Sequence, residues 1–220
     1  MSLYPIFLNI EKTPCLVVGG GEVAERKVLS LLEAKAKVTV VSPELTDALK
    51  KLVKTKKIRH IKRVYKAGDI KGFSLVISAA SSLKANKEAG KEAKKLRIPL
   101  NVVDNPTLCT FIVPAIVKRG ELMIAISTSG KSPYFAKTLR LFLDEVIPRE
   151  FGVLVNIIGA VRNKLLKQSL KNDKKVGIYA KFMNPVFFAL LRKKDRQGID
   201  RFLKGLLGRG YGLSSLGIRI

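Results

Sequence analysis

The chain has 220 residues, of which 47% are hydrophobic, and its 42 Lys and Arg against 17 Asp and Glu give a formal net charge of +25. This size and apolar content predict a folded protein with a substantial core and exclude an intrinsically disordered chain. No apolar run approaches the roughly 18 residues of a membrane span, and the N-terminus lacks a signal-peptide pattern, so we expect a cytoplasmic protein without a membrane partner. Cys15 and Cys109 form neither a disulfide framework nor a metal knuckle, and we predict no metal site.

The excess of positive charge has three interpretations. A nucleic-acid-binding surface would gather basic residues in one stripe, with aromatic residues between them. Here they occur throughout, for example at Lys50–Lys57 and at Lys91–Lys95, so we expect no nucleic-acid partner. A basic solvated surface and a positive field that attracts a polyanionic small substrate both stay open.

The first hundred residues alternate between strand-like and helix-like patterns. We predict strands at 15–18, 37–41, 57–65, 73–80 and 98–103, and helices at 22–34, 44–54 and 84–96. This alternation is typical of an α/β protein with a Rossmann-type parallel sheet, which we place at residues 1–110. Lys35 follows the first helix, at a position where a glycine would adopt the left-handed C-terminal conformation more easily.

A glycine turn after the first strand carries the strongest local motif. Read as G-x-G-x-x-A, it puts Gly19 at the tight turn, Gly21 against a pyrophosphate, and Ala24 at the close contact between strand and helix. The start of the next helix offers unpaired N–H groups and a positive dipole end to a dinucleotide phosphate. The predicted cofactor-binding residues are Gly19, Gly20, Gly21, Glu22, Val23, Ser42, Pro43 and Ala80.

The residues leave the choice between NAD and NADP open. The second strand ends in Ser42-Pro43, where an Asp or Glu would bind the ribose 2′-hydroxyl of NAD and repel the 2′-phosphate of NADP. Ser42 can donate a hydrogen bond to either group. The sole histidine, His60, lies in the next predicted strand, and we expect it to be structural.

The pattern changes after the strand that ends before Asp104. A connecting segment, which we place at 111–150, contains a strand at 122–126, a hydroxyl-rich loop at 127–133 and a helix at 134–147. From 151 to 220 we predict a basic helical region, with a helix at 151–165 and final residues that fray.

Five blocks occur in order along the chain: Tyr4–Phe7, Val17–Lys27, Asn101–Asp104, Phe111–Ala115 and Ser127–Pro133. Together they resemble the precorrin-2 dehydrogenase family, which includes the N-terminal module of siroheme synthases. The resemblance implies an oxidoreductase of siroheme and porphyrin-type tetrapyrrole biosynthesis that oxidises precorrin-2 to sirohydrochlorin with NAD. In some members ferrous iron is then inserted, which is a lyase activity. A homodimer, built largely from the connecting segment, is also implied.

The same resemblance assigns roles to two further places in the chain. The essential acid of the family falls on Asp104, which would remove a proton as the hydride leaves. Its alternative is a turn-initiating Asp before Asn-Pro. The substrate-binding loop falls on Thr128, Ser129, Gly130, Lys131 and Ser132, and we expect one of its hydroxyls to cap the next helix. In some relatives a serine of this loop is phosphorylated, and here that position is Thr128 or Ser129.

Two alternatives are kept beside this interpretation. A non-catalytic NAD(H)-binding regulatory module would use the same glycine turn, but it leaves Asp104 without a purpose. Iron insertion lacks a ligand cluster in the sequence, although Asp104 could accept the pyrrole protons without holding the metal.

Overall fold

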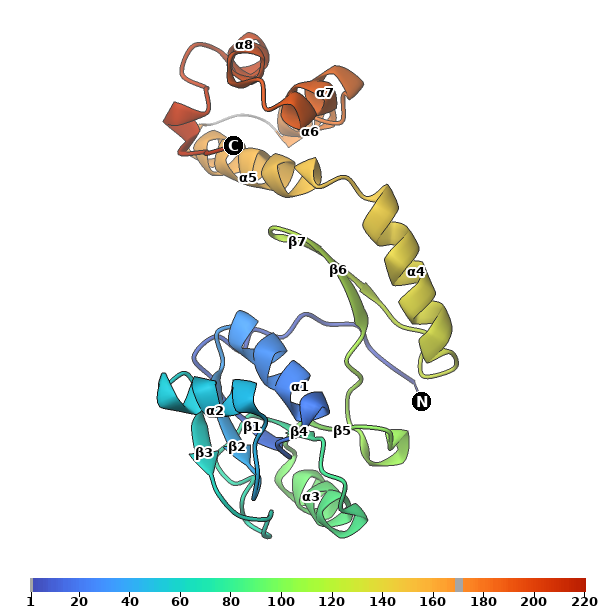
Figure 1. Ribbon diagram of the computed structural model, residues 1–220. Helices are drawn as coiled ribbons and strands as arrows, with labels where there is room; N and C mark the ends of the chain where they lie inside the picture. The colour runs from blue at the N-terminus through green and yellow to red at the C-terminus, as the bar shows by residue number, and fades with distance from the viewer. Residues whose placement is uncertain (1, 169–171) are drawn as a thin grey trace. The chain divides into compact units, whose positions relative to one another are not determined.

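A computed structural model describes residues 2–168 and 172–220, and in it the chain divides into two compact units (Figure 1). The first unit runs to Val113 and includes Ser129–Lys131, and the second comprises Pro114–Thr128 and Ser132–Ile220. Each unit has a hydrophobic core of its own.

The first unit is built on a parallel sheet. Its strands lie in the order β3-β2-β1-β4-β5 and are β1 (Pro14–Val18), β2 (Lys37–Val41), β3 (Arg59–Ile61), β4 (Leu75–Ser78) and β5 (Leu100–Val102). Because the strand order reverses beside β1, the carboxyl ends of β1, β2 and β4 open a crevice of the kind that binds ligands in open α/β sheets. The predicted Rossmann-type α/β class is confirmed.

Helices cover both faces of this sheet (Figure 1). On one face α1 (Glu22–Glu33) and α2 (Asp47–Lys54) meet Cys15 and Val17 of β1. On the other face α3 (Leu83–Leu96) lies over Leu16 and Val18. Successive strand residues therefore point into opposite apolar layers, which explains why β1 is a continuous apolar run.

Several predicted elements are shorter than expected, and β4 and β5 each lose residues at both ends. α2 begins at Asp47 and not at residue 44, because the Thr46 side chain caps the helix by accepting a backbone N–H. β3 ends at Ile61 and not at residue 65, because the chain leaves the sheet and Arg63 pairs with Asp69 at 2.7 Å. The expected left-handed residue after α1 is Lys35, with a φ of 59°.

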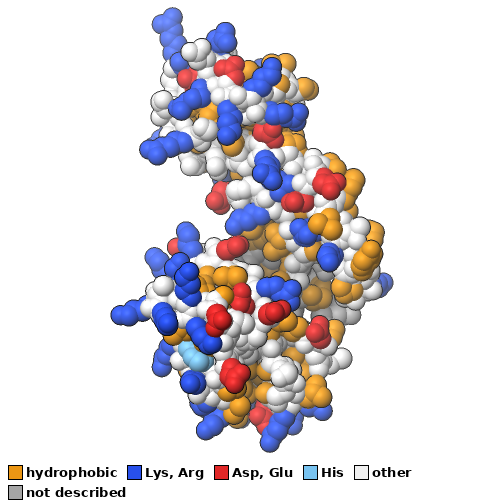
Figure 2. Space-filling view, in the orientation of Figure 1, with side chains coloured by type: hydrophobic (Ala, Val, Ile, Leu, Met, Phe, Trp, Pro, Cys, Tyr) orange, Lys and Arg blue, Asp and Glu red, His pale blue; other side chains and the backbone are white. Residues whose placement is uncertain are grey.

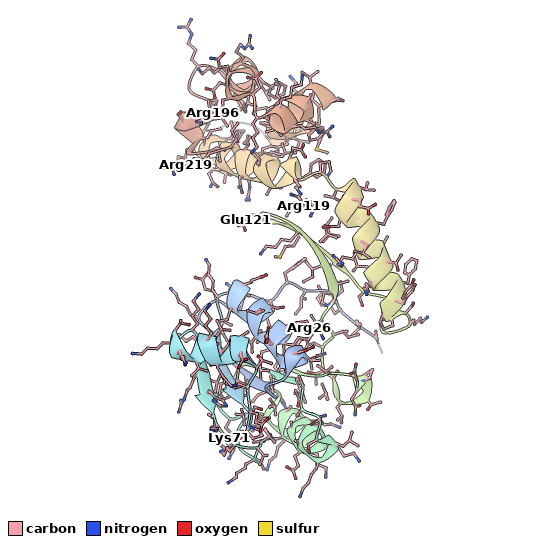
Figure 3. All side chains as sticks on the ribbon, in the orientation of Figure 1. Arg26, Lys71, Arg119, Glu121, Arg196 and Arg219 are labelled. Carbon is pink, nitrogen blue, oxygen red and sulfur yellow. The ribbon has the colours of Figure 1, made fainter. Side chains whose placement is uncertain are left out.

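The second unit begins with a β-hairpin that packs on a helix. β6 (Ala115–Arg119) and β7 (Leu122–Ile126) are antiparallel, and α4 (Pro133–Val146) buries Ala136 against them. Arg119 is the last residue of β6 (Figure 3), and its side chain pairs with the Asp144 carboxylate at 2.8 Å and donates to the Ile147 carbonyl at 3.0 Å at the C-terminal end of α4. A cation at the last carbonyls of a helix also complements the helix dipole, so Arg119 fixes α4 to the hairpin.

The remainder of the second unit is helical. It contains α5 (Glu150–Leu166), α6 (Asn172–Ala180), α7 (Pro185–Lys193) and α8 (Arg196–Leu207), and short 3-10 turns lie at Pro106–Leu108 in the first unit and at Ser214–Leu216 here. Phe187 stacks on Phe202 with ring centroids 4.3 Å apart. Leu213 is buried and Ile218 packs on the same core, so the prediction that the final residues fray is wrong. Among the helices of the described residues, none combines the length and apolar character needed to cross a membrane.

Candidate functional site

A cleft of about 1040 Å³ lies at the carboxyl edge of the parallel sheet. Its walls come from the glycine turn after β1, the segment after β2, the loop between β3 and β4, and the start of α3. The predicted cofactor-binding residues that line it are Gly19, Gly20, Gly21, Ser42, Pro43 and Ala80. Glu22 and Val23 form the first turn of α1 and are not among the lining residues.

Glycine is suited to each of the three positions for a different physical reason. Gly19 has a φ of 114°, and a Cβ there would lie 2.6 Å from the Ala79 carbonyl oxygen. A Cβ on Gly20 would lie 1.9 Å from the Glu44 carbonyl oxygen. Gly21 has a φ of −82°, and a Cβ there would meet nothing within 4 Å. The fold therefore requires Gly19 and Gly20, whereas the bare backbone at Gly21 leaves space for a ligand.

The N-terminus of α1 forms part of the cleft wall. Gly21 is both a lining residue and the residue that precedes α1, and no side chain caps this helix. The first N–H groups of an α-helix lack partners within the helix and carry the positive end of its dipole. An anionic group in the cleft would find hydrogen-bond donors here, and this fits the pyrophosphate of a dinucleotide.

Ser42 is held by the neighbouring strand. Its backbone N–H donates to the Ile61 carbonyl at 3.2 Å, and its carbonyl accepts from His60 Nε2 at 2.9 Å. His60 therefore supports the end of β2, which agrees with a structural role. Ser42 is 7% exposed, and its hydroxyl lies beside the glycine turn.

One wall of the cleft is a loop that carries no sequence motif. Val64, Tyr65, Lys66 and Ala67 line the cleft from the segment between β3 and β4. The Tyr65 hydroxyl donates to the Glu92 carboxylate of α3 at 2.7 Å, and burial, with this carboxylate beside it, holds the pKa of Tyr65 above its usual range. These residues were missed by the sequence analysis, because their contact joins residues far apart in the chain.

A second missed residue supports Ala80 at the end of β4. Asn86 of α3 is buried, and its amide donates to the Ala80 carbonyl at 3.1 Å while its oxygen accepts from the Ser78 hydroxyl at 2.6 Å. The sequence does carry a sign of this role, because Asn86 is a single Asn on the apolar face of a helix. A buried amide needs hydrogen-bond partners, so such a residue is expected to hold a neighbouring segment.

Asp104 lies at the same edge of the sheet. β5 pairs with β4, and the N–H of Val103 donates to the Ser78 carbonyl at 2.9 Å, so Asp104 follows one residue beyond this contact. Its side chain is exposed, and its φ is 58°. Asp104 is not among the residues that line the cleft.

The turn that carries Asp104 is tied to Cys109. The N–H of Asn105 donates to the Val102 carbonyl at 3.2 Å and closes the turn. The Cys109 sulfur accepts from the Val102 N–H at 3.1 Å and donates to the Asn105 carbonyl at 3.3 Å. Asp104 thus sits in a short turn that is fixed at both ends.

The residues of the hydroxyl-rich loop make contacts of different kinds and belong to different units. The Thr128 hydroxyl donates to the Ser132 carbonyl at 3.1 Å and accepts from the Ser132 N–H at 3.0 Å. The Ser132 side chain accepts from the Phe135 N–H and caps α4, as expected of one hydroxyl in this loop. Ser129, Gly130 and Lys131 belong to the first compact unit, whereas Thr128 and Ser132 belong to the second.

Charged side chains are spread widely over the surface. Figure 2 shows Lys and Arg over both units on the face in view, and they do not form a single stripe. Within residues 2–168 and 172–220, no group of three or more His, Cys, Asp or Glu side chains could hold a metal ion.

Comparison with known proteins gives both sequence and structural matches. Curated relatives named siroheme synthase include those of Vesicomyosocius okutanii, 38% identical over 199 residues, and Methylobacillus flagellatus, 44% identical over 162 residues. The matches cover 90% and 74% of this chain but 42% and 35% of the relatives, so the chain spans less than half of their length. A solved structure of SirC, precorrin-2 dehydrogenase, has a TM-score of 0.72 at 20% identity, covers 89% of this chain and 98% of its own, and shares the fold.

The resemblance to siroheme synthases that the motifs predicted is confirmed by these matches. Residues 6–115 match the family described as "Putative NAD(P)-binding". The matched range contains the glycine turn, the whole parallel sheet and Asp104. The chain therefore belongs to this NAD(P)-binding family.

Proposed function

We propose that the chain is a dehydrogenase that oxidises precorrin-2 to sirohydrochlorin with NAD⁺. The observation that carries the proposal is the cleft beside Gly21, where the backbone is left bare for a dinucleotide at the sheet edge that also bears Asp104. The siroheme synthase relatives and the NAD(P)-binding family support the choice of substrate and cofactor.

The chemistry divides between the cofactor and the chain. Bound NAD⁺ supplies the hydride acceptor. The N-terminus of α1 and the glycine turn bind the pyrophosphate, and the small residue Ala80 leaves room beside the end of β4. Precorrin-2 loses one hydride and one proton, and the exposed Asp104 carboxylate accepts the proton. The products are sirohydrochlorin, NADH and a proton that Asp104 releases to water.

The hydroxyl-rich loop is proposed to bind the substrate. Thr128 and Ser132 hold the shape of the loop through their mutual hydrogen bonds, and Ser129, Gly130 and Lys131 are exposed at its tip. A lysine at an exposed tip suits a substrate that bears several carboxylates, and the basic surface attracts such an anion.

We also propose a homodimer that forms through the connecting segment, residues 111–150. Figure 2 shows hydrophobic side chains gathered over α4, where Phe135 is 56% and Phe142 57% exposed. Exposed aromatic side chains on one helix are typical of a surface that a partner covers. A second copy is the occupant that the family resemblance implies.

The Asp104→Asn variant tests the proposed base. Asn adopts the left-handed conformation as readily as Asp, so the turn keeps its shape. We expect NADH formation with precorrin-2, measured anaerobically by absorbance, to fall by about 100-fold or more. Affinity for NAD⁺, measured by calorimetry, stays unchanged because Asp104 does not line the cleft.

Other results of these assays would contradict parts of the proposed function. An unchanged rate in Asp104→Asn removes the base role from Asp104. NAD⁺ binding without any turnover in the wild type contradicts the enzyme and supports the regulatory module. Ferrous iron added after oxidation tests the second activity, because Asp104 could accept the pyrrole protons that iron displaces.

A further inference from the structure

The cleft wall between β3 and β4 is attached to α3 by the carboxylate of Glu92. Glu92 Oε2 accepts a hydrogen bond from the Tyr65 hydroxyl at 2.7 Å and another from the Gly68 backbone N–H at 3.0 Å. Tyr65 belongs to the lining segment 64–67, and Gly68 follows this segment directly. Glu92 therefore holds the wall at two points.

Burial fixes the side chain that makes the first of these bonds. Tyr65 is 8% exposed and belongs to the apolar cluster that contains Ala89 and Ala93 of α3. Burial, with the Glu92 carboxylate beside it, keeps the pKa of Tyr65 above its usual range, so the hydroxyl stays protonated at neutral pH. Tyr65 is therefore a donor to Glu92 throughout the neutral range.

A second carboxylate stabilises the same loop in a different way. Asp69 pairs with Arg63 at 2.7 Å and accepts a hydrogen bond from the Lys66 N–H at 2.8 Å, and all three residues belong to the loop. These contacts fix the internal shape of the loop. The contacts of Glu92 instead join the loop to α3, so the two effects can be separated by substitution.

Glu92 is not among the residues that line the cleft, so its effect on a ligand there must pass through the loop. A wall that moves freely before binding loses this freedom when a ligand orders it, and the loss weakens the affinity. A wall that is already held in place avoids this loss.

We propose that Glu92 is a positioning residue that holds segment 64–67 in the conformation that binds NAD⁺. The inference rests on the proposed use of the cleft as the cofactor site. Glu92 acts from behind the wall, because it orders the loop against α3 before the cofactor binds. It contributes to the affinity through the loop and not through contact with the cofactor.

Calorimetric titration with NAD⁺ tests the proposal without turnover. We expect the dissociation constant of Glu92→Ala to rise about tenfold, because the wall loses both hydrogen bonds to α3. Glu92→Gln should recover most of the affinity, since its amide oxygen can accept both bonds. This rescue separates the role of the acceptor from an effect of net charge.

Tyr65→Phe removes one of the two bonds and keeps the buried ring. Its dissociation constant for NAD⁺ should rise about threefold. When it is combined with Glu92→Ala, the value should be that of Glu92→Ala alone, because the hydroxyl then has no acceptor to lose.

Asp200→Ala is the matched control for lost stability. The Asp200 carboxylate accepts the backbone N–H of Leu213 at 2.7 Å in the second unit, so its removal also takes an acceptor from a buried segment. Urea unfolding should show a loss of stability for both Asp200→Ala and Glu92→Ala, whereas Asp200→Ala should bind NAD⁺ like the wild type.

Several outcomes would overturn the proposal. They are an unchanged dissociation constant in Glu92→Ala, an equal rise in Asp200→Ala, no recovery in Glu92→Gln, or losses that simply multiply in the double variant. Each of these removes the role from Glu92 and leaves the cofactor site standing. A wild type that does not bind NAD⁺ removes both proposals.

Discussion

Asp104 occupies the left-handed region of the backbone, with a φ of 58°. Asp and Asn tolerate this region better than most residues do, at a modest energetic cost. The surrounding bonds must hold the turn, and the Cys109 sulfur makes two of them, to the Val102 N–H and the Asn105 carbonyl. We therefore regard Cys109 as a positioning residue for the proposed base.

Removing the Cys109 sulfur should loosen this turn. For Cys109→Ala we expect a loss of about 1 kcal/mol in the free energy of unfolding, because the Val102 N–H loses its acceptor. The kcat for precorrin-2 should fall, whereas the dissociation constant of NAD⁺ should not change. Cys109→Ser should recover part of the kcat, because a hydroxyl can make the same two bonds.

Cys15→Ala is the matched control. Cys15 is buried in β1, and burial raises the pKa of its thiol to about 11. This variant removes apolar packing alone, so it should lower stability and leave kcat unchanged. Equal kcat in Cys109→Ala and the wild type would contradict the positioning role of Cys109.

At the scale of elements, the parts that were predictable are those with a local signal. β1, β4 and α1 have continuous or periodic apolar residues, and the glycine turn has a fixed spacing. The loop between β3 and β4 has no such signal. Its conformation comes from the pairs Arg63–Asp69 and Tyr65–Glu92, and the second of these joins residues 27 positions apart.

The Arg63–Asp69 pair should make the stability of this loop depend on pH. The hydrogen bonds from Arg63 hold the pKa of Asp69 below its usual range. The pair therefore stabilises the fold above the ordinary Asp pKa of about 4, and this contribution is lost as pH falls through the lower folded value. Arg63 is 36% exposed and solvent screens part of the attraction, so we expect about 1 kcal/mol for Asp69→Asn at pH 7.

Urea unfolding of Asp69→Asn and wild type at pH 7, 5 and 3 measures this effect. The difference between them should be largest at pH 7 and should shrink at pH 3. Asp47→Asn is the control, because Asp47 is 96% exposed in its pair with Lys50 and should change stability little at any pH. A difference for Asp69→Asn that does not vary with pH would contradict the ion-pair account.

At the scale of the whole molecule, the charge of +25 and the apolar surface of α4 concern association. Phe142 is 57% exposed, so Phe142→Glu should fold and should place a charge on the proposed dimer surface. We expect sedimentation velocity to show a dimer for the wild type and a shift to monomer for Phe142→Glu. The control is Leu29→Glu, at an apolar residue of α1 that is 43% exposed, and it should stay dimeric. A monomeric wild type would contradict the dimer.

The packing of the last fifty residues could not be predicted from the sequence. Their many Lys, Arg and Gly suggested an extension with a frayed end. Their core instead joins Leu154, Phe187, Phe202 and Leu213, which come from α5, α7, α8 and the segment after α8. α5 was predicted from its own apolar spacing, whereas α7 and the segment after α8 are too short to show a strong apolar period, and the core exists only when all of these segments meet.

The glycine turn shows two kinds of constraint within one motif. The fold requires glycine at positions 19 and 20, because a side chain on Gly19 or Gly20 would collide with backbone atoms. Gly21 meets no such obstacle, so the fold by itself would accept another small residue there. The bare backbone at Gly21 serves the proposed cofactor site instead, so adjacent glycines of one motif meet two different physical requirements.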